Sequence, residues 1–209
     1  GLPMIFVGDH GQLEPIDSNF NLMEKPDYKL ETIHRNAGDV ARFAEHLRNG
    51  YASRSFKCKD DSVQFIFNHK LTDSQLIEAD QIICAYNKTR TEINSRVRNI
   101  QGYKGTIQIG ERVMCLRNNR KAGLFNGMQG TVSNLYKGKY GKKYMDFQFD
   151  DMILHDVWYD DSCFGELSYK FKIGQDTPNP FDYAYCITCH KSQGDQFSSV
   201  LVIEQKCNK

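Results

Sequence analysis

Residues 183–197 gather side chains that could bind the phosphates of a nucleic acid. The block reads Tyr-Ala-Tyr-Cys-Ile-Thr-Cys-His-Lys-Ser-Gln-Gly-Asp-Gln-Phe. Hydroxyl, imidazole, ammonium and amide groups that stand close together suit the backbone of a single strand. The residues that supply these groups are Thr188, His190, Lys191, Ser192 and Gln193.

Apolar runs flank these polar residues on both sides. Residues 183–189 read as a buried strand, 190–195 as a turn and 200–203 as a second buried strand. In α/β proteins, ligands bind where such strands end. We therefore expect the turn to lie at the edge of a sheet, with Gly194 allowing a ligand to approach the backbone closely.

A second group of polar residues follows an apolar run at 3–8, which predicts a short buried strand. The sequence continues Gly8-Asp9-His10-Gly11-Gln12-Leu13. At the end of a strand, Asp9 and Gln12 could project polar atoms toward a phosphate or a metal-bound water. An ordinary β-turn with an Asx-type hydrogen bond would explain the same residues, and this alternative stays open.

Arg35 stands shortly before an amphipathic stretch at 39–51, which predicts a helix that stops near Gly50. A guanidinium in this position can present its planar fork to phosphate oxygens across a cleft, as an arginine finger does. A surface arginine in a loop is the alternative for Arg35 taken alone.

The phosphate-binding block also contains the c-type haem signature C-x-x-C-H, at Cys186, Cys189 and His190. Such a site requires an exported chain, and residues 1–3 do not open a signal peptide. We therefore interpret the two cysteines as small apolar residues of a strand.

Composition fits a soluble cytoplasmic protein of 209 residues, as one large domain or two small ones. The seven cysteines are scattered, and no second C-x-x-C completes a zinc site, so we expect no metal bound by this chain's own residues. No apolar stretch has the length of a membrane span. A net charge of +1 means that any nucleic-acid contact must come from local patches.

The remaining pattern predicts an α/β part interrupted by a small barrel. Residues 81–86 read as a buried strand, and Asn87 as the cap of a helix with Ile93, Val97 and Ile100 on one face. Between 105 and 174, short alternating runs separated by Gly and Asn predict an antiparallel barrel. These runs are 112–116, 129–136 and 144–149, and the hinge back to the α/β part is expected at 176–180.

Basic residues occur in two further places. On the helix after Asn87 they read as a solvated face: Lys88, Arg90, Arg96 and Arg98. In the barrel, basic residues alternate with tyrosines at 136–144, where they could track phosphates and stack bases. A soluble hairpin tip at a sheet edge is the alternative for 137–143. The other basic residues of the barrel are Arg112, Arg117, Arg120 and Lys121.

Several of these blocks, in order, resemble motifs of superfamily 1B DNA helicases of the RecD/Dda type. Residues 188–197 resemble T-x-H-K-S-Q-G-x-E-F, 8–13 resemble G-D-x-x-Q-L, and 30–35 resemble L-x-x-x-x-R. Residues 126–132 match N-G-x-x-G-x-V, a frequent phrase of the Src-homology-3-like barrel inserted in these motors. One departure is Gln196, which occupies the slot where the family has Glu.

The resemblance implies a RecA-like α/β helicase fold that contains this barrel. Residues 1–35 would end the first RecA-like domain, 36–104 and 175–209 would form the second, and 105–174 the barrel. It implies binding of single-stranded DNA through the residues of the first block, and of ATP with magnesium at the cleft between the domains. By resemblance, the catalytic residues are Gln12 and Arg35. The nucleotide-binding residues are Asp9, Gln12, Arg35, Gly194 and Gln196.

The phosphate loop G-x-x-x-x-G-K-[ST] occurs nowhere in the sequence. We therefore expect a fragment of an ATP-dependent helicase that moves 5′ to 3′, with the main ATP-binding residues elsewhere in a longer protein and no ATPase activity of its own. Partners would include single-stranded DNA and replication or recombination proteins. A motor subunit of an ATP-dependent exonuclease and a non-enzymatic nucleic-acid-binding module remain as alternatives.

Overall fold

The computed structural model describes residues 4–8, 25, 27–28, 38–169 and 177–206. The chain forms two compact units, Gly1–Leu71 and Thr72–Lys209. Short 3-10 helices occur in both units: η1 (Ser53–Ser55), η2 (Asn68–Lys70), η3 (Arg120–Ala122), η4 (Lys139–Gly141) and η5 (Asp161–Cys163). Within the described ranges, no helix has the length and hydropathy that crossing a membrane requires.

The first unit is built around α1 (Gly38–Arg48), which confirms the helix predicted at 39–51. The ring of Phe43 lies 5.1 Å from that of Phe56 and 5.5 Å from that of Phe65. At the start of α1, the buried carboxylate of Asp39 accepts the backbone N–H of Asp60 at 2.8 Å. Aromatic packing and this buried carboxylate fix the segment after α1 against the helix.

The buried strand predicted at 3–8 is wrong for residues 4–8, which form no strand. Their side chains are exposed, with Ile5 89% and Val7 91% accessible. The described residues of the first unit include no other strand. An apolar run becomes a strand only when a neighbouring strand pairs its backbone and covers its side chains.

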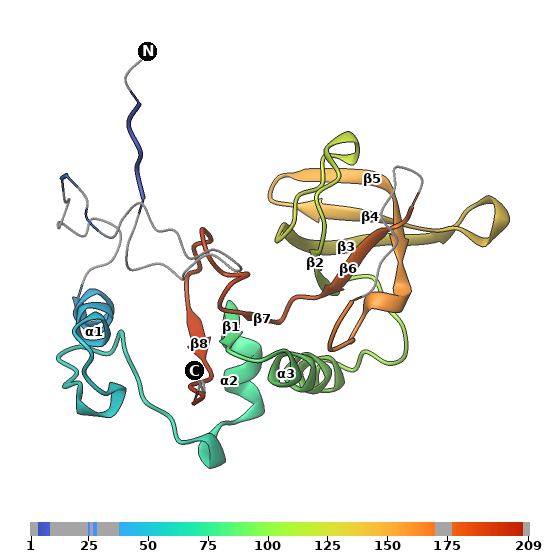
Figure 1. The fold of residues 1–209 in the computed structure, drawn as a ribbon. Helices are drawn as coiled ribbons and strands as arrows, with labels where there is room; N and C mark the ends of the chain where they lie inside the picture. Colours follow the sequence, from blue (N-terminus) through green and yellow to red (C-terminus); the bar gives the residue numbers. More distant parts are fainter. Residues whose placement is uncertain (1–3, 9–24, 26, 29–37, 170–176, 207–209) are drawn as a thin grey trace. The chain divides into compact units, whose positions relative to one another are not determined.

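The α/β part of the second unit is a parallel sheet with strand order β7-β1-β8 (Figure 1). The strands are β1 (Gln81–Cys84), β7 (Cys186–Thr188) and β8 (Val200–Val202). The buried strand predicted at 81–86 is confirmed; the strand predicted at 200–203 is present but not buried, since Val200 and Val202 are 46% and 61% exposed. Ile82 of β1 lies opposite Cys186 on one side and Leu201 on the other. A parallel sheet accompanied by helices is the expected α/β arrangement.

Two helices accompany this sheet. The first, α2 (Asp73–Glu78), begins with a capping box between Thr72 and Gln75. The second, α3 (Asn87–Ile100), contacts β1 and β7. The prediction that Asn87 caps α3 is wrong, because Tyr86 occupies the N-cap position and Asn87 is already helical. Its Oδ1 instead accepts the Nε–H of Arg90 at 3.2 Å.

Between α3 and β7 the chain forms a closed barrel of order β2-β3-β4-β5-β6 (Figure 1). The barrel confirms the predicted all-β insertion. Four neighbouring pairs are antiparallel, and β5 pairs with β6 in parallel. The strands are β2 (Arg112–Cys115), β3 (Gln129–Lys137), β4 (Lys143–Phe149), β5 (Met152–Asp160) and β6 (Asn179–Tyr183).

The barrel extends past the 105–174 range expected from the sequence, because its last strand is β6. The Asn179-Pro180 pair reads as a hinge in the sequence, yet both residues are buried in this strand. Proline is tolerated where a strand begins, since its missing N–H is not needed there. The carbonyl oxygen of Pro180 accepts the N–H of Leu116 at 3.0 Å.

The barrel core explains the glycine at position 130. Gly130 lies opposite Val113, and a Cβ added to it would meet the backbone oxygen of Gln148 and lie 2.7 Å from the ring of Phe147. That ring is fully buried, with its centroid 5.4 Å from that of Phe181. Only a residue without a side chain fits here, where the β3 backbone lies against β4 and the Phe147 ring.

Only Ala184 and Tyr185 separate the last barrel strand from the sheet strand β7. The amide nitrogen of the buried Gln81 side chain donates to the carbonyl oxygens of both, at 3.2 and 3.1 Å. The apolar run 183–189 is therefore not one strand, as predicted, but the end of β6, a buried connection and β7.

Candidate nucleic-acid interface

The polar turn after β7 lies at the carboxyl edge of the sheet, as expected. Because β1 and β7 are parallel and Cys84 lies opposite Thr188, the residues after both positions leave the sheet at the same edge. In α/β proteins this edge is where ligands bind. The sheet thus places the turn at 189–195 beside the start of α3.

Backbone hydrogen bonds give the turn its shape. The N–H groups of Lys191 and Ser192 donate to the carbonyl oxygen of Thr188, at 2.8 and 3.2 Å. The Ser192 hydroxyl donates to the carbonyl oxygen of Cys189 at 2.9 Å. Gly194 has a φ of +92°, and the space that a Cβ would occupy is open. Glycine is therefore suited to this position by its backbone conformation.

The candidate DNA-binding side chains differ in exposure. His190 and Gln193 are exposed on the turn, whereas Thr188, Lys191 and Ser192 are half-buried. The two candidate nucleotide-binding residues of this block, Gly194 and Gln196, are exposed as well. The end of β7 and the turn after it thus place all seven residues within the stretch 188–196.

Lys191 is turned toward the barrel. Its ammonium group donates to Oδ1 of Asn126, in the loop between β2 and β3. The N–H of Asn126 in turn donates to Oδ1 of Asn118 at 2.7 Å, which fixes the position of Asn126. Burial, together with the positive charge of Arg90, holds the pKa of Lys191 below its usual range.

Asp195 is also turned toward the barrel. The side-chain amide of Gln129, the first residue of β3, donates to Oδ2 of Asp195 at 3.3 Å. Burial raises the pKa of the Asp195 carboxyl, and the hydrogen bond from Gln129 partly opposes this. Two residues further on, Phe197 packs against a cluster of buried side chains that includes Met114, Leu116 and Ile187.

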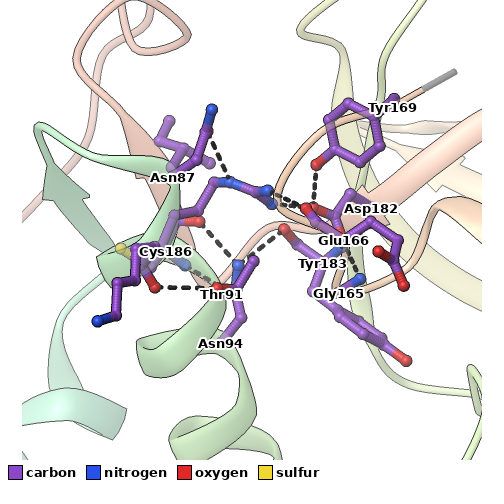
Figure 2. A network of polar contacts seen from close by, with 12 residues as sticks. Asn87, Thr91, Asn94, Gly165, Glu166, Tyr169, Asp182, Tyr183 and Cys186 are labelled. Atoms are coloured by element: carbon purple, nitrogen blue, oxygen red, sulfur yellow. Dashed lines mark hydrogen bonds and ion pairs between the residues drawn. The ribbon is translucent and has the colours of Figure 1, made fainter.

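The prediction of a solvated basic face on α3 is wrong for Arg90, which is 2% exposed. Figure 2 shows the polar network to which its partners Asn87, Glu166 and Asp182 belong. Arg90 forms an ion pair with Asp182 of β6 and donates to the carbonyl oxygen of Glu166 at 2.6 Å. Asp182 also accepts the N–H of Gly165 at 2.7 Å and the hydroxyl of Tyr169. The signal that sequence reasoning missed is a carboxylate, Asp182, inside an apolar run.

One turn along α3, Asn94 holds the connection between barrel and sheet (Figure 2). Its side-chain amide donates to the carbonyl oxygens of Tyr183 and Cys186, at 3.2 and 3.0 Å. Its oxygen accepts the N–H of Cys186 at 2.8 Å. Asn94 is 1% exposed, so it satisfies three backbone groups that water does not reach.

A further turn along, Arg98 forms an ion pair with the buried Glu111, just before β2. Its guanidinium lies 4.0 Å from the ring centroid of Tyr183. Burial acts to lower the pKa of Arg98, but the hydrogen bond that its guanidinium donates to Glu111 and neighbouring negative charge raise it overall. Arg98 is therefore also an anchor of the barrel and not part of a solvated face. Lys88 and Arg96 are exposed, as predicted.

The basic and aromatic hairpin between β3 and β4 is partly committed to the barrel. Tyr136 and Tyr144 stack at 5.5 Å, and the ammonium of Lys142 lies 3.9 Å from the ring centroid of Trp158. Lys143 forms an ion pair with Asp161. Tyr140 at the tip is 98% exposed.

Two of the other basic residues of the barrel also have partners within the protein. Arg112 donates to the Asp80 carbonyl oxygen, and Arg117 donates to Thr177 Oγ1.

The cysteines of the haem-like signature lie in structural positions. Cys186 is fully buried in β7, and its thiol is hydrogen-bonded with that of the equally buried Cys84 of β1. The Sγ of Cys189 donates to the Cys84 carbonyl oxygen at 3.4 Å. Among residues 4–8, 25, 27–28, 38–169 and 177–206, no group of three or more His, Cys, Asp or Glu side chains is placed to hold a metal ion.

The remaining site predictions, Asp9, Gln12 and Arg35, lie outside the described residues.

Comparison with known proteins gives no match to a family model and none to a curated protein. Among solved structures, the chain is similar to unliganded Pif1 from Bacteroides sp., with 20% identity over 62% of this chain and a TM-score of 0.40. It is also similar to Pif1 helicase from Bacteroides in complex with ADP-AlF3 and single-stranded DNA, with 18% identity over 66% of this chain and a TM-score of 0.43. The chain is also similar to Pif1 helicase from Candida albicans, with 17% identity over 78% of this chain and a TM-score of 0.45.

The matched segments cover 48%, 41% and 47% of those three chains, so this chain spans less than half the length of each.

Proposed function

We propose that this chain is the later part of an ATP-dependent DNA helicase motor of the RecD/Dda type, and that Thr188 at the end of β7 and the turn after it bind single-stranded DNA through residues 188–193. The observation that carries the proposal is the placement of this turn at the carboxyl edge of a parallel sheet. It presents imidazole, hydroxyl, ammonium and amide groups on one short stretch, next to an inserted barrel. The resemblance of the ordered sequence blocks supplies the rest of the argument.

The same proposal assigns the ATP chemistry. Gln12 and Arg35 would act on the nucleotide with Asp9, Gly194 and Gln196 nearby, and the α/β and all-β parts would be the second RecA-like domain and the Src-homology-3-like barrel. Movement would run 5′ to 3′ in the full protein. Because the sequence contains no phosphate loop, the chain by itself should release no phosphate from ATP. ATP hydrolysis by this purified chain, lost in Arg35→Ala, would overturn that part.

The DNA-binding part can be tested by fluorescence anisotropy with a labelled oligothymidylate. Lys191→Gln removes the positive charge but keeps an amide that can meet Asn126. We expect weaker binding and a salt dependence that is shallower by about 0.7 in log–log slope, the value for one phosphate contact on a single strand. The matched control is Lys104→Gln, because Lys104 is exposed beyond the opposite end of α3. Equal effects of the two changes would contradict the proposal.

A second candidate is a non-enzymatic nucleic-acid-binding module whose affinity lies in the barrel. The observation that favours it is the exposed ring of Tyr140 between Lys139 and Lys142 at a hairpin tip. Base stacking on such a ring contributes about 1–3 kcal/mol. If Tyr140→Ala abolishes oligothymidylate binding while Lys191→Gln does not change it, this candidate replaces the first. A motor subunit of an exonuclease would be distinguished by isolation of the full protein with its nuclease.

A further inference from the structure

The turn that carries the candidate DNA-binding residues is docked on one region of the barrel. Three side chains of residues 191–197 reach that region: Lys191 contacts Asn126, Asp195 contacts Gln129, and Phe197 packs against a buried cluster that includes Met114 and Leu116. The barrel residues belong to β2, to the start of β3 and to the loop between them. Contacts at the beginning, middle and end of an exposed stretch restrict its backbone more than any one of them would.

The contact at Asp195 is built for a specific donor and acceptor. Gln129 lies opposite Met114 in the β2–β3 pair, so its backbone is fixed by the barrel. Its amide nitrogen donates to Oδ2 of Asp195, and its Oε1 is buried without a hydrogen-bond partner. A carboxylate accepts hydrogen bonds and does not donate them, so in this pair Gln129 must be the donor and Asp195 the acceptor.

We propose that Gln129 and Asn126 are positioning residues, which hold Asp195 and Lys191 and thereby set the shape in which residues 190–194 meet a DNA strand. This inference rests on the proposed function of the turn. It assigns the carboxylate after Gly194 to the barrel rather than to the nucleotide. Through this contact, the inserted barrel acts on the DNA-binding turn of the α/β part without touching the strand itself.

A reciprocal pair of isosteric changes tests the proposal. Gln129→Glu places two carboxylates against each other, Asp195→Asn leaves an amide that can still accept, and the combined variant reverses the direction of the hydrogen bond. In oligothymidylate binding near neutral pH, we expect Gln129→Glu to lose about 5- to 10-fold in affinity, the equivalent of one hydrogen bond. Asp195→Asn should change affinity less than about 2-fold, and the combined variant should return to that level.

The cycle separates positioning from simple charge. If charge alone mattered, Asp195→Asn would strengthen binding by as much as Gln129→Glu weakens it, and the two effects would add. That result would overturn the inference. If Gln129 acts by positioning Asp195, the change in affinity of the combined variant should differ strongly from the sum of the changes in the two single variants. Positioning also predicts that the affinity ratio of wild type to Gln129→Glu falls toward one at about pH 5, because two facing carboxyl groups then share a proton.

Hydrogen exchange on the same proteins gives a readout that needs no DNA. In Gln129→Glu, the amides of residues 189–197 should exchange faster, and the combined variant should restore the wild-type rate. Failure of the wild type to bind oligothymidylate would overturn the proposed function, while faster exchange in Gln129→Glu would still support the docking by Gln129. Unchanged exchange in that variant would overturn the positioning inference.

Discussion

Arg90 of α3 and Asp182 of β6 form an ion pair that water does not reach, with side chains 3% and 0% exposed. The pair joins the helix that covers the sheet to the strand that closes the barrel. Asp182 takes further hydrogen bonds from Gly165 and Tyr169, so its carboxylate is satisfied in the interior. Removing only one partner of such a buried pair strongly lowers the stability of the fold, because the other charge is left buried without compensation.

Removing the carboxylate should therefore destabilise the second unit strongly. We expect Asp182→Ala to lower the free energy of unfolding by about 3–5 kcal/mol, because it leaves the Arg90 charge buried without its partner. The matched control is Arg96→Ala on the same helix, whose ion pair with Asp73 is about half exposed, and which should cost less than about 1 kcal/mol. Urea unfolding measures both, and similar losses would contradict the role assigned to burial.

Substitution of Asn94 should also lower the free energy of unfolding, although Asn94 carries no charge. Asn94→Leu keeps a side chain of similar size but leaves the Cys186 N–H and two carbonyl oxygens unpaired in the interior. Each unsatisfied group costs about 1–3 kcal/mol, so we expect a loss of at least about 2 kcal/mol in thermal or urea unfolding. Asn99→Leu, at an exposed position of the same helix, should stay within about 0.5 kcal/mol of wild type.

Gly130→Ala tests the close approach of the β3 backbone to β4 and to the Phe147 ring in the barrel core. The new methyl group would meet the Gln148 carbonyl and the Phe147 ring, and neither can move without opening the barrel. We expect a loss of about 1–3 kcal/mol or more on the scale of overpacked cores. Gly127→Ala is the comparison, since its φ is +93° but its surroundings are open, and it should cost about 1 kcal/mol through the backbone alone. A smaller loss at Gly130 than at Gly127 would contradict the assigned contact.

Tyr183 gives a pH dependence whose sign can be worked out. Burial raises the pKa of Tyr183 to about 12, above the usual value of 10. The folded protein therefore keeps this proton where the unfolded chain loses it, so Tyr183 contributes stability below about pH 10 that is lost as pH rises toward 12. Tyr183→Phe should move the midpoint of alkaline unfolding to higher pH, as measured by circular dichroism. Tyr140→Phe, at a 98% exposed ring, should leave the midpoint unchanged.

Several strands of the second unit and its helix α3 could be predicted from sequence because their signals are local, whereas α2 and β5 were not predicted. Apolar runs at 81–86 and 200–203 and alternation at 129–136 each become the expected strand. The Asn87 cap was mispredicted because Asn is favoured both before a helix and as a partner for a nearby side chain, and here Arg90 takes its oxygen.

The contacts that position the candidate site could not be predicted, because they join residues far apart in the chain. Gln129 and Asp195 lie 66 positions apart, and Arg90 and Asp182 lie 92 apart. A lone arginine on a helix reads as solvated until a carboxylate on another element is placed against it. The turn itself was predicted at a sheet edge from its own residues, but its dependence on the barrel follows only from the folded arrangement.

The order of the strands also determines when the protein can fold during synthesis. Gln81 in β1 contacts the connection before β7 across 103 positions, and β8 follows later still. All five barrel strands leave the ribosome before either neighbour of β1 is available. Contacts at such separation form slowly, so the barrel should fold first and present α3 as a template. Until β7 and β8 emerge, β1 is an apolar strand with two unpaired edges, which is the period when the nascent chain is most prone to aggregate.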